Sequence, residues 1–354
     1  MNTDQQHTAD ENDLNNHLGL TAFLRNKTPA PRALTIDGYT RLSKADCAKY
    51  KEERIDYLST DITVITPQLE RIAMSTLSTM RTNRGKKWGR QGVLVSGESN
   101  MGKTTAILNT ARIVFQDYTR NHSEWEANGD IPVAFVNVPE GTTVKAMLGR
   151  FCEFFGYTPR KSDTVEMMKR FVVPQLNGRR TVLVIVDEIH NLEGGNRDSA
   201  KTVDFLKDLS NSIHATFIYA GIDIHQGAIF SGTSRDRQVR GRFRQQLIDN
   251  YGYTTSEHKV VWRGIVQAFG SELRLLAQSP QELTGFSDYL YNRTRGGIGP
   301  LNQLLRESAQ YAIATAKRPE NEELTLALMD KIDLDMSTEE ATGGWRSTDS
   351  AHAA

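Results

Sequence analysis

Short, continuously apolar runs alternate with amphipathic segments through the middle of the chain. The apolar runs are rich in Val, Ile and Leu and cover residues 92–97, 133–138, 181–188 and 215–221. The segments between them repeat apolar residues at helical spacing over 104–116, 143–155, 164–176 and 200–213. Continuous apolar runs predict strands buried on both faces, and the amphipathic segments predict helices that cover them. The pattern therefore predicts an α/β fold, with a parallel sheet sandwiched by helices.

Helical patterns flank this region on both sides. Upstream, apolar residues recur at three- and four-residue spacings, and Pro67 suits the first turn of a helix there. Downstream, the strand-like runs stop, and helical patterns follow at 262–277, 281–293, 299–315 and 322–331. We therefore expect five parts: a flexible N-terminal segment (1–38), a helical segment (39–90), an α/β core (91–261), a helical lid (262–335) and a flexible tail (336–354).

Composition excludes several classes of protein. The 354 residues carry 43 Lys and Arg against 43 Asp and Glu, so any basic surface must be local. With only Cys47 and Cys152, neither near a metal-ligand pattern, we expect no disulfide scaffold and no structural zinc. No apolar run approaches the roughly 20 residues that span a bilayer, and the N-terminus lacks the pattern of a secretion signal. We expect a cytoplasmic protein with no membrane association.

Residues 97–104, Gly-Glu-Ser-Asn-Met-Gly-Lys-Thr, carry the pattern of a phosphate-binding loop. Its glycines let successive backbone N–H groups turn toward phosphate oxygens at the start of a helix. Lys103 is expected to reach the β- and γ-phosphates, and the Thr104 hydroxyl to bind Mg²⁺. The pattern follows a predicted strand and opens a predicted helix, as the motif requires. The candidate ATP-binding residues are Gly97, Glu98, Ser99, Asn100, Met101, Gly102, Lys103, Thr104 and Thr105.

The third predicted strand ends in Asp187-Glu188. We expect Asp187 to lie beside the phosphate-binding loop and hold Mg²⁺ through water, and Glu188 to act as the general base for the attacking water. A glutamate at this position favours hydrolysis over nucleotide binding alone. His190 follows closely, and it has two interpretations: a relay between Glu188 and a neighbour, or a hydrogen-bonded loop histidine.

Five arginines lie within ten residues after the fourth predicted strand, at positions 235, 237, 240, 242 and 244. Ring-forming ATPases use an arginine near here to reach the γ-phosphate of a neighbouring subunit. We choose Arg242 for this role, and nucleic-acid contact or solvation could explain the others. DNA-binding candidates elsewhere are Arg81, Arg84, Lys86, Lys87 and Lys145, for which plain solvation is the alternative.

These residues resemble those of AAA+ ATPases, and within that group the TniB/TnsC-type transposition ATPases, relatives of the Mu B protein. The resemblance covers about residues 45 to 330. The segments that carry it are 53–57, 66–67, 97–105, 187–192, 219–222, 241–243 and 296–306. The chain departs from this pattern where a polar sensor is usual, at Gly221-Ile222-Asp223, with Asp223 a weak substitute. A lid arginine in a Gly-x-x-Arg setting is also missing, since Gly299 and Pro300 occupy that stretch.

The resemblance implies a slow, DNA-stimulated ATPase that needs ATP and Mg²⁺. Its ATP-bound subunits would assemble on duplex DNA as a ring or helical filament and recruit or activate an integrase-like DDE transposase. Hydrolysis would then disassemble them. The alternative is a nucleotide-switched scaffold or loader that acts on a protein partner without binding DNA, which the zero net charge favours.

Overall fold

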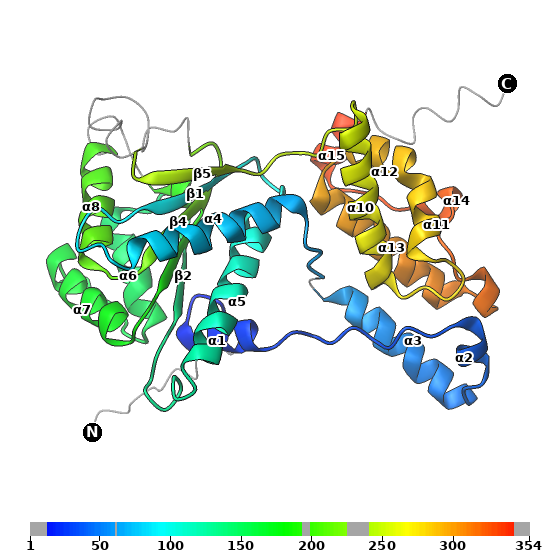
Figure 1. Ribbon diagram of the computed structural model, residues 1–354, viewed down its shortest axis with the longest axis horizontal. Coiled ribbons are helices and arrows are strands. Elements are labelled where there is room, and N and C mark those ends of the chain that lie inside the picture. The colour runs from blue at the N-terminus through cyan, green and yellow to red at the C-terminus, as the bar shows by residue number, and fades with distance from the viewer. Residues whose placement is uncertain (1–12, 61, 193–198, 225–240, 343–354) are drawn as a thin grey trace. The chain divides into compact units, whose positions relative to one another are not determined.

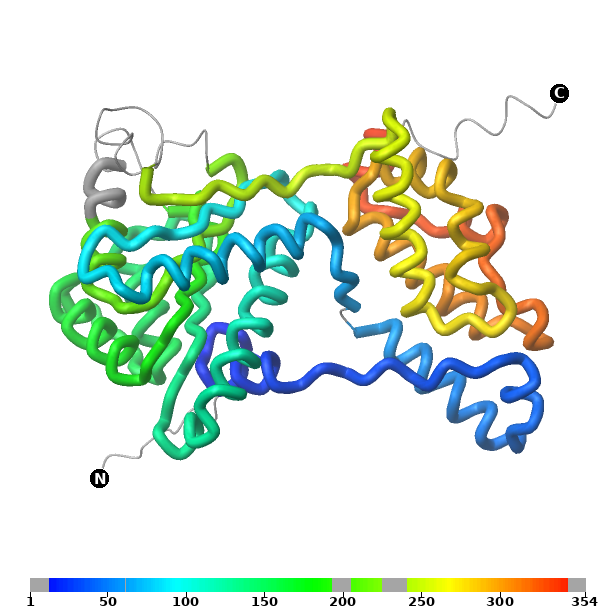
Figure 2. Tube along the Cα trace, viewed as in Figure 1, coloured from blue at the N-terminus to red at the C-terminus, as the bar shows by residue number. Residues whose placement is uncertain are grey.

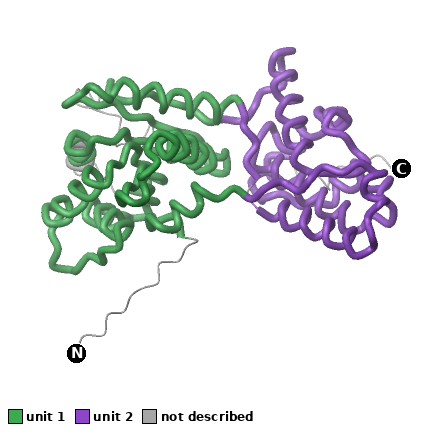
Figure 3. Tube along the Cα trace, turned by 60° about the horizontal axis from the view of Figure 1, so that its bottom comes forward, with its two compact units in different colours: residues 1–27, 67–248 green, residues 28–66, 249–354 purple. Residues whose placement is uncertain are grey.

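The structure, a computed structural model, describes residues 13–60, 62–192, 199–224 and 241–342, and for residues 199–204 it describes the backbone alone. The chain forms two compact units (Figure 3). Unit 1 contains residues 1–27 and 67–248, and unit 2 contains residues 28–66 and 249–354. The trace therefore leaves unit 1 after residue 27 and returns to it at residue 67 (Figure 2). The expected helical segment 39–90 is thus divided between the two units.

Unit 1 is built on a five-stranded parallel sheet with the order β2-β3-β4-β1-β5, so the predicted fold class is confirmed (Figure 1). Four strands match the apolar runs: β1 (Gly92–Ser96), β2 (Val133–Asn137), β3 (Leu183–Asp187) and β4 (Thr216–Gly221). Nearly all of their residues are buried. Because all neighbouring strands pair in parallel, their carboxyl ends lie along one side of the sheet, the carboxyl edge, and their amino ends lie along the opposite side, the amino edge.

The fifth strand is a feature that the sequence pattern does not reveal. β5 (Phe243–Leu247) pairs with β1 at the edge of the sheet, with Gly92 opposite Phe243 and Ser96 opposite Leu247. Its sequence Phe-Arg-Gln-Gln-Leu is mostly polar, and none of its residues is fully buried. Unlike β2, the other edge strand, β5 is only partly covered, so it does not need the continuous apolar run by which the other four strands were found.

Helices cover the sheet of unit 1. They are α4 (Pro67–Asn83), α5 (Lys103–Asn121), α6 (Val144–Phe154), α7 (Val165–Gly178) and α8 (Ser199–Ser212). A further helix, α1 (His17–Arg25), lies in the segment expected to be flexible. Its Leu20 and Leu24 are about 1% exposed and join the core of unit 1. α1 also lies against α5, where Arg112 stacks over Phe23 and donates to its carbonyl oxygen.

Unit 2 is helical and has its own apolar core, which includes Trp262, Phe269 and Leu305. Its helices are α2 (Ile36–Thr40), α3 (Lys44–Ser59), α10 (Ser256–Leu273), α11 (Pro280–Leu283), α12 (Ser287–Thr294), α13 (Ile298–Thr315), α14 (Leu326–Met329) and α15 (Met336–Ala341). The helix expected over 322–331 is reduced to α14. Among the described helices of both units, none is long and apolar enough to cross a membrane.

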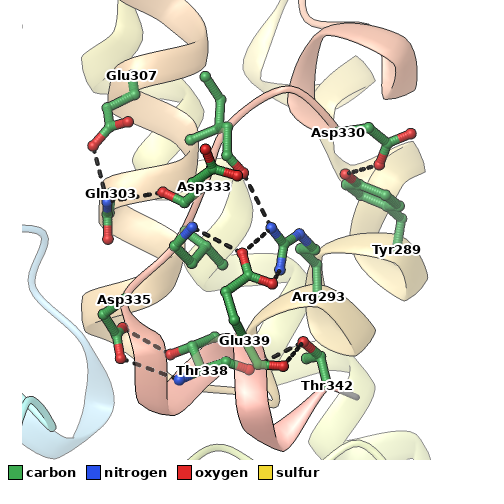
Figure 4. Close-up of polar contacts among 12 residues, drawn as sticks. Tyr289, Arg293, Gln303, Glu307, Asp330, Asp333, Asp335, Thr338, Glu339 and Thr342 are labelled. Atoms are coloured by element: carbon green, nitrogen blue, oxygen red, sulfur yellow. Dashed lines mark hydrogen bonds and ion pairs between the residues drawn. The ribbon is translucent and has the colours of Figure 1, made fainter. Parts of the chain in front are cut away.

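Two buried arginines join distant parts of unit 2. Arg54 of α3 forms a two-pronged ion pair with Glu322, and both side chains are at most 1% exposed. Arg293 of α12 donates to Glu339 of α15 and to the Ile332 carbonyl oxygen (Figure 4). α15 lies in the segment expected to be a flexible tail, and the Arg293 contacts explain why this part of it is ordered.

Candidate nucleotide-binding site

The phosphate-binding loop runs from the carboxyl end of β1 into the first turn of α5. Asn100 and Gly102 have left-handed backbone conformations, with φ of +59° and +85°, and they curl the loop. In the described structure α5 begins without a side-chain cap, with Gly102 at its N-cap position. The first N–H groups of α5 are therefore left for an anion, which the helix dipole also favours. Glu98, Ser99 and Asn100 are exposed, and Met101 packs partly against the core.

Gly97 is required by the close approach of a neighbouring segment. A Cβ at Gly97 would lie 2.4 Å from the carbonyl oxygen of Ile248, the residue after β5. The Ile248 N–H donates to the Ser96 carbonyl oxygen at 2.8 Å, which fixes that segment beside the loop. The loop therefore starts at a point where only glycine fits.

Lys103 is 5% exposed, and its ammonium group lies across the loop and donates to the Glu98 carbonyl oxygen at 2.6 Å. Burial lowers the pKa of Lys103, while the nearby carboxylates, chiefly Glu188 and Asp187, oppose that change. Because both carboxylates act on the same ammonium group, the loop and the end of β3 lie close together. A polyphosphate would add negative charge beside the same ammonium.

Thr104 and Asp187 converge from α5 and β3. The Thr104 hydroxyl donates to a carboxylate oxygen of Asp187 at 2.7 Å, and Asp187 is 2% exposed. Burial raises the pKa of Asp187, against the Thr104 hydrogen bond and the Glu188 N–H, which donates to the other carboxylate oxygen at 2.9 Å. Among the described residues, no group of three or more His, Cys, Asp or Glu side chains is placed to hold a metal ion. A hydroxyl beside one carboxylate fits Mg²⁺, which takes few protein ligands and binds phosphate oxygens and water.

Glu188 follows Asp187 in a strained conformation. Its φ of +55° is left-handed, which is uncommon for a residue with a side chain and is concentrated at functional sites. The Glu188 side chain is partly exposed, so it is open to a water molecule in a way that Asp187 is not. The backbone therefore turns sharply between a buried carboxylate and a reachable one.

His190, for which the sequence left open a relay between Glu188 and a neighbour or a hydrogen-bonded loop histidine, lies between Glu188 and the end of β4. Its Nδ1 atom is 3.2 Å from a Glu188 carboxylate oxygen and 3.2 Å from the Ile222 backbone nitrogen. Nδ1 must be unprotonated to accept from the Ile222 N–H and protonated to donate to Glu188, so it can make only one of these hydrogen bonds at a time. A Cβ on Gly221 would lie 2.8 Å from this Nδ1.

This contact occurs where a polar sensor side chain was expected. Ile222 contributes its backbone N–H to His190, and Asp223 is exposed with a φ of +44°. β4 lies between β1 and β3, so its carboxyl end lies between the strand that leads into the phosphate-binding loop and the strand that ends at Asp187. The Asp223 carboxylate also acts on the pKa of Lys103, as the third of the opposing carboxylates.

Arg242 lies at the amino edge of the sheet, opposite the phosphate-binding loop. It directly precedes β5, and its carbonyl oxygen accepts from the N–H of Gly92 at the amino end of β1. The strand β1 separates it from the loop of its own subunit. Arg244 donates to the Ser78 hydroxyl at 2.9 Å, so it has a structural partner on α4. Arg235, Arg237 and Arg240 lie outside the described residues.

The candidate DNA-binding residues lie on opposite sides of the sheet, one at its carboxyl edge and four at its amino edge. Lys145 is in the first turn of α6, after β2, and its ammonium group donates to the Lys161 carbonyl oxygen at 3.0 Å. The other four, Arg81, Arg84, Lys86 and Lys87, lie where α4 leads into the amino end of β1. They and Lys145 therefore belong to separate surfaces of unit 1.

The sheet order, the phosphate-binding loop and the Asp-Glu pair define an AAA+ P-loop fold. The family model described as bacterial TniB protein matches residues 54–253, and the chain belongs to the TniB family. None of the curated proteins compared with the chain matches it.

Several solved structures share the fold. The Aeropyrum pernix ORC2 protein in its ADPNP-ADP complexes has a TM-score of 0.53 and 16% identity, covering 77% of this chain and 69% of that chain. Cdc6p from Pyrobaculum aerophilum has a TM-score of 0.51 and 12% identity, covering 78% and 74%. Drosophila ORC bound to DNA has a TM-score of 0.50 and 14% identity, covering 82% and 67%. At these identities the similarity shows the fold alone.

Proposed function

We propose that this protein is an ATPase of transposition that binds DNA in its ATP-bound state and recruits or activates a DDE-type transposase. The observation that carries the ATPase is the convergence of Lys103, Thr104, Asp187 and Glu188 at one edge of the sheet. Membership of the TniB family supports the role in transposition.

The four side chains divide the work of hydrolysis. Lys103 and the N–H groups of α5 bind the phosphates, and Thr104 and Asp187 hold Mg²⁺, which offsets charge on the phosphates when bound. Glu188 accepts the proton of the attacking water, and His190 fixes the direction of its carboxylate. The missing polar sensor supports slow turnover, since the Ile222 side chain cannot hydrogen-bond the attacking water.

Arg242 supports self-association. Because it lies at the amino end of β5, away from the loop of its own subunit, it can act only on the nucleotide of another copy. A finger of this kind is worth about 10³ to 10⁵ in rate in related phosphoryl transfers. Subunits would then join through the nucleotide as a ring or helical filament, and hydrolysis would release them.

DNA binding would use phosphate contacts, with low sequence specificity and a steep dependence on salt. The basic residues at 81–87 and Lys145 are the candidates, and their two positions allow DNA to be contacted at either edge of the sheet. The second candidate function is a nucleotide-switched scaffold or loader for a protein partner. The zero net charge is the observation that favours it.

An ATPase assay with and without duplex DNA tests the proposal. We expect duplex DNA to stimulate hydrolysis by the wild-type protein, and Lys103→Ala to abolish nucleotide binding, because it removes the charge that offsets the phosphates. Lys49→Ala is the matched control, since Lys49 is an exposed lysine of unit 2. ATP hydrolysis that ignores DNA, together with no DNA binding in the presence of ATP, would favour the scaffold.

A further inference from the structure

A large cavity opens at the amino edge of the sheet in unit 1, the edge opposite the phosphate-binding loop. Its volume is about 1360 Å³, above the roughly 300–1,000 Å³ that is usual for small-molecule sites. The walls come from the end of α4, residues 84–87 and Arg90, the last turns of α5 and the chain just before β3 and β4. Its size and open mouth suit a segment of a polymer better than a small metabolite.

The cavity is strongly basic. The cations Arg81, Arg84, Lys86, Lys87, Arg90, Arg120 and Arg180 line it, and they come from three separate parts of the chain. Asp117 is the single acidic residue among the described lining residues, and its side chain accepts from Asn121 on the same helix. Arg180 forms an ion pair with Asp130 at 3.5 Å.

Most of these cations lack a partner. Within the described residues, the side chains of Arg81, Arg84, Lys86, Lys87 and Arg120 make no ion pair or hydrogen bond. The Nε atom of Arg90 is buried there without a hydrogen-bond partner. Unpaired cations in a recess repel one another, so a bound polyanion would stabilise this edge of the sheet.

Aromatic rings accompany the cations. Trp88 is 78% exposed, and it lies between Lys87 and Gly89, whose φ of +66° turns the chain. Tyr118 and His122 line the cavity and stack on each other, with ring centroids 4.2 Å apart. Exposed aromatic faces among cations are typical of sites that stack unpaired bases and bind their phosphates. An acidic peptide would use the cations but gives no reason for an exposed tryptophan.

We propose that this cavity binds a single-stranded segment of DNA, with phosphates on the cations and a base stacked on Trp88. The proposal rests on the proposed function, since it refines how the protein contacts DNA. A duplex keeps its bases paired and stacked, so it offers no free base to Trp88. A single strand presents both phosphates and unpaired bases. Its phosphates can therefore contact Arg90, the half-buried lining cation just before β1, while a base stacks on Trp88. The cavity lies away from the phosphate-binding loop, so we expect it to hold a single strand with or without ATP, whereas the ATP-dependent binding of the proposed function concerns duplex DNA.

The test measures binding of a labelled oligothymidylate and of a labelled duplex by fluorescence anisotropy, without nucleotide. Trp88→Ala should weaken single-strand binding about 5- to 150-fold, since stacking on an aromatic side chain is worth roughly 1–3 kcal/mol per base. Arg120→Ala should weaken it and lower the salt slope by about 0.7, the value for one single-strand phosphate contact. Duplex binding should change by less than about twofold with Trp88→Ala, because only an unpaired base stacks on it.

Two variants of unit 2 are matched controls. Tyr311→Ala removes an aromatic ring that is 45% exposed and lies near the ammonium of Lys331, and Lys317→Ala removes an exposed cation. Neither should alter binding of the oligothymidylate. If Trp88→Ala leaves single-strand binding unchanged, or weakens single-strand and duplex binding equally, the proposal is wrong. Competition by polyglutamate as strong as that by unlabelled oligothymidylate would also overturn it, in favour of an acidic peptide.

Failure of this proposal can be distinguished from failure of the proposed function. The same variants are assayed for ATP hydrolysis with duplex DNA. Duplex-stimulated hydrolysis without any single-strand binding by the wild-type protein would overturn the cavity proposal and leave the proposed function standing. A wild-type protein that binds neither form of DNA, with or without ATP, would overturn both.

Discussion

Replacing Arg54 by alanine should destabilise unit 2 severely. The Arg54 guanidinium is fully buried, donates to both oxygens of the Glu322 carboxylate, and donates to the Arg274 carbonyl oxygen at 2.9 Å. The Glu322 carboxylate is 1% exposed in the structure. Without Arg54, its remaining donor is the Leu276 N–H, at 3.0 Å. An uncompensated buried charge costs about 3–5 kcal/mol. That is a large part of the roughly 5–15 kcal/mol by which a protein is stable.

The assay is urea denaturation followed by circular dichroism, with hydrogen exchange to localise the loss. Arg54→Ala should lower the free energy of unfolding by about 3–5 kcal/mol and speed exchange in α3 and α10. Lys49→Ala on the same helix is the control. Lys49 forms an exposed pair with Glu53 at 3.9 Å, so its loss should cost less than about 1 kcal/mol.

The double variant Arg54→Met with Glu322→Gln tests the cause of the destabilisation. It removes the charge of the carboxylate and keeps an acceptor for the Leu276 N–H, so it should be more stable than Arg54→Ala. A loss for Arg54→Ala no larger than that of Lys49→Ala would refute the reasoning. So would a double variant that is less stable than the single one.

Three further predictions concern the nucleotide site. Glu188→Gln should keep ATP bound while hydrolysis falls about 10²- to 10⁴-fold, because the amide is a poor base. Phosphate release measures hydrolysis and calorimetry measures ATP binding. Hydrolysis at the wild-type rate would show that Glu188 is not the general base. Gly221→Ala should lower the rate of ATP hydrolysis about 10- to 100-fold with ATP affinity unchanged, since the added Cβ displaces His190. Gly264→Ala is the control: its added Cβ meets nothing within 4 Å, so it should change neither the rate nor the affinity. Arg242→Ala and Lys103→Ala should each be inactive, and mixing them should restore hydrolysis where an intact site meets an intact arginine; co-assembly without recovered activity would exclude a role for Arg242 across subunits.

The central features of unit 1 could be predicted because each is encoded locally. Strands of a parallel sheet that helices cover on both faces appear as continuous apolar runs, and β1, β2, β3 and β4 were found in this way. The phosphate-binding loop is a contiguous sequence whose glycines have backbone reasons, as Gly97 and Gly102 show. Asp187 and Glu188 were found because they end one of the predictable strands.

The remaining features depend on residues that only the fold brings together. His190 meets the Ile222 N–H, 32 residues away, and neither residue alone indicates the contact. Arg54 and Glu322 are separated by 268 residues, so their buried pair leaves no local pattern. β5 was missed because a partly covered strand needs no apolar run, and α1 because its few apolar residues lie within a polar segment. The cations of the cavity come from three parts of the chain and form a cluster only after folding.

The division of unit 2 between two parts of the chain has a consequence for its synthesis. Unit 1 is complete at residue 248, whereas α3 must wait for partners that are translated after it. At about 5–20 residues per second, the 268 residues between Arg54 and Glu322 take roughly 13 to 54 seconds to synthesise. During that time the buried face of α3 lacks its partners, and the last residue of unit 1 is translated before them. The helices α2 and α3 are therefore translated early but belong to the unit that is completed last.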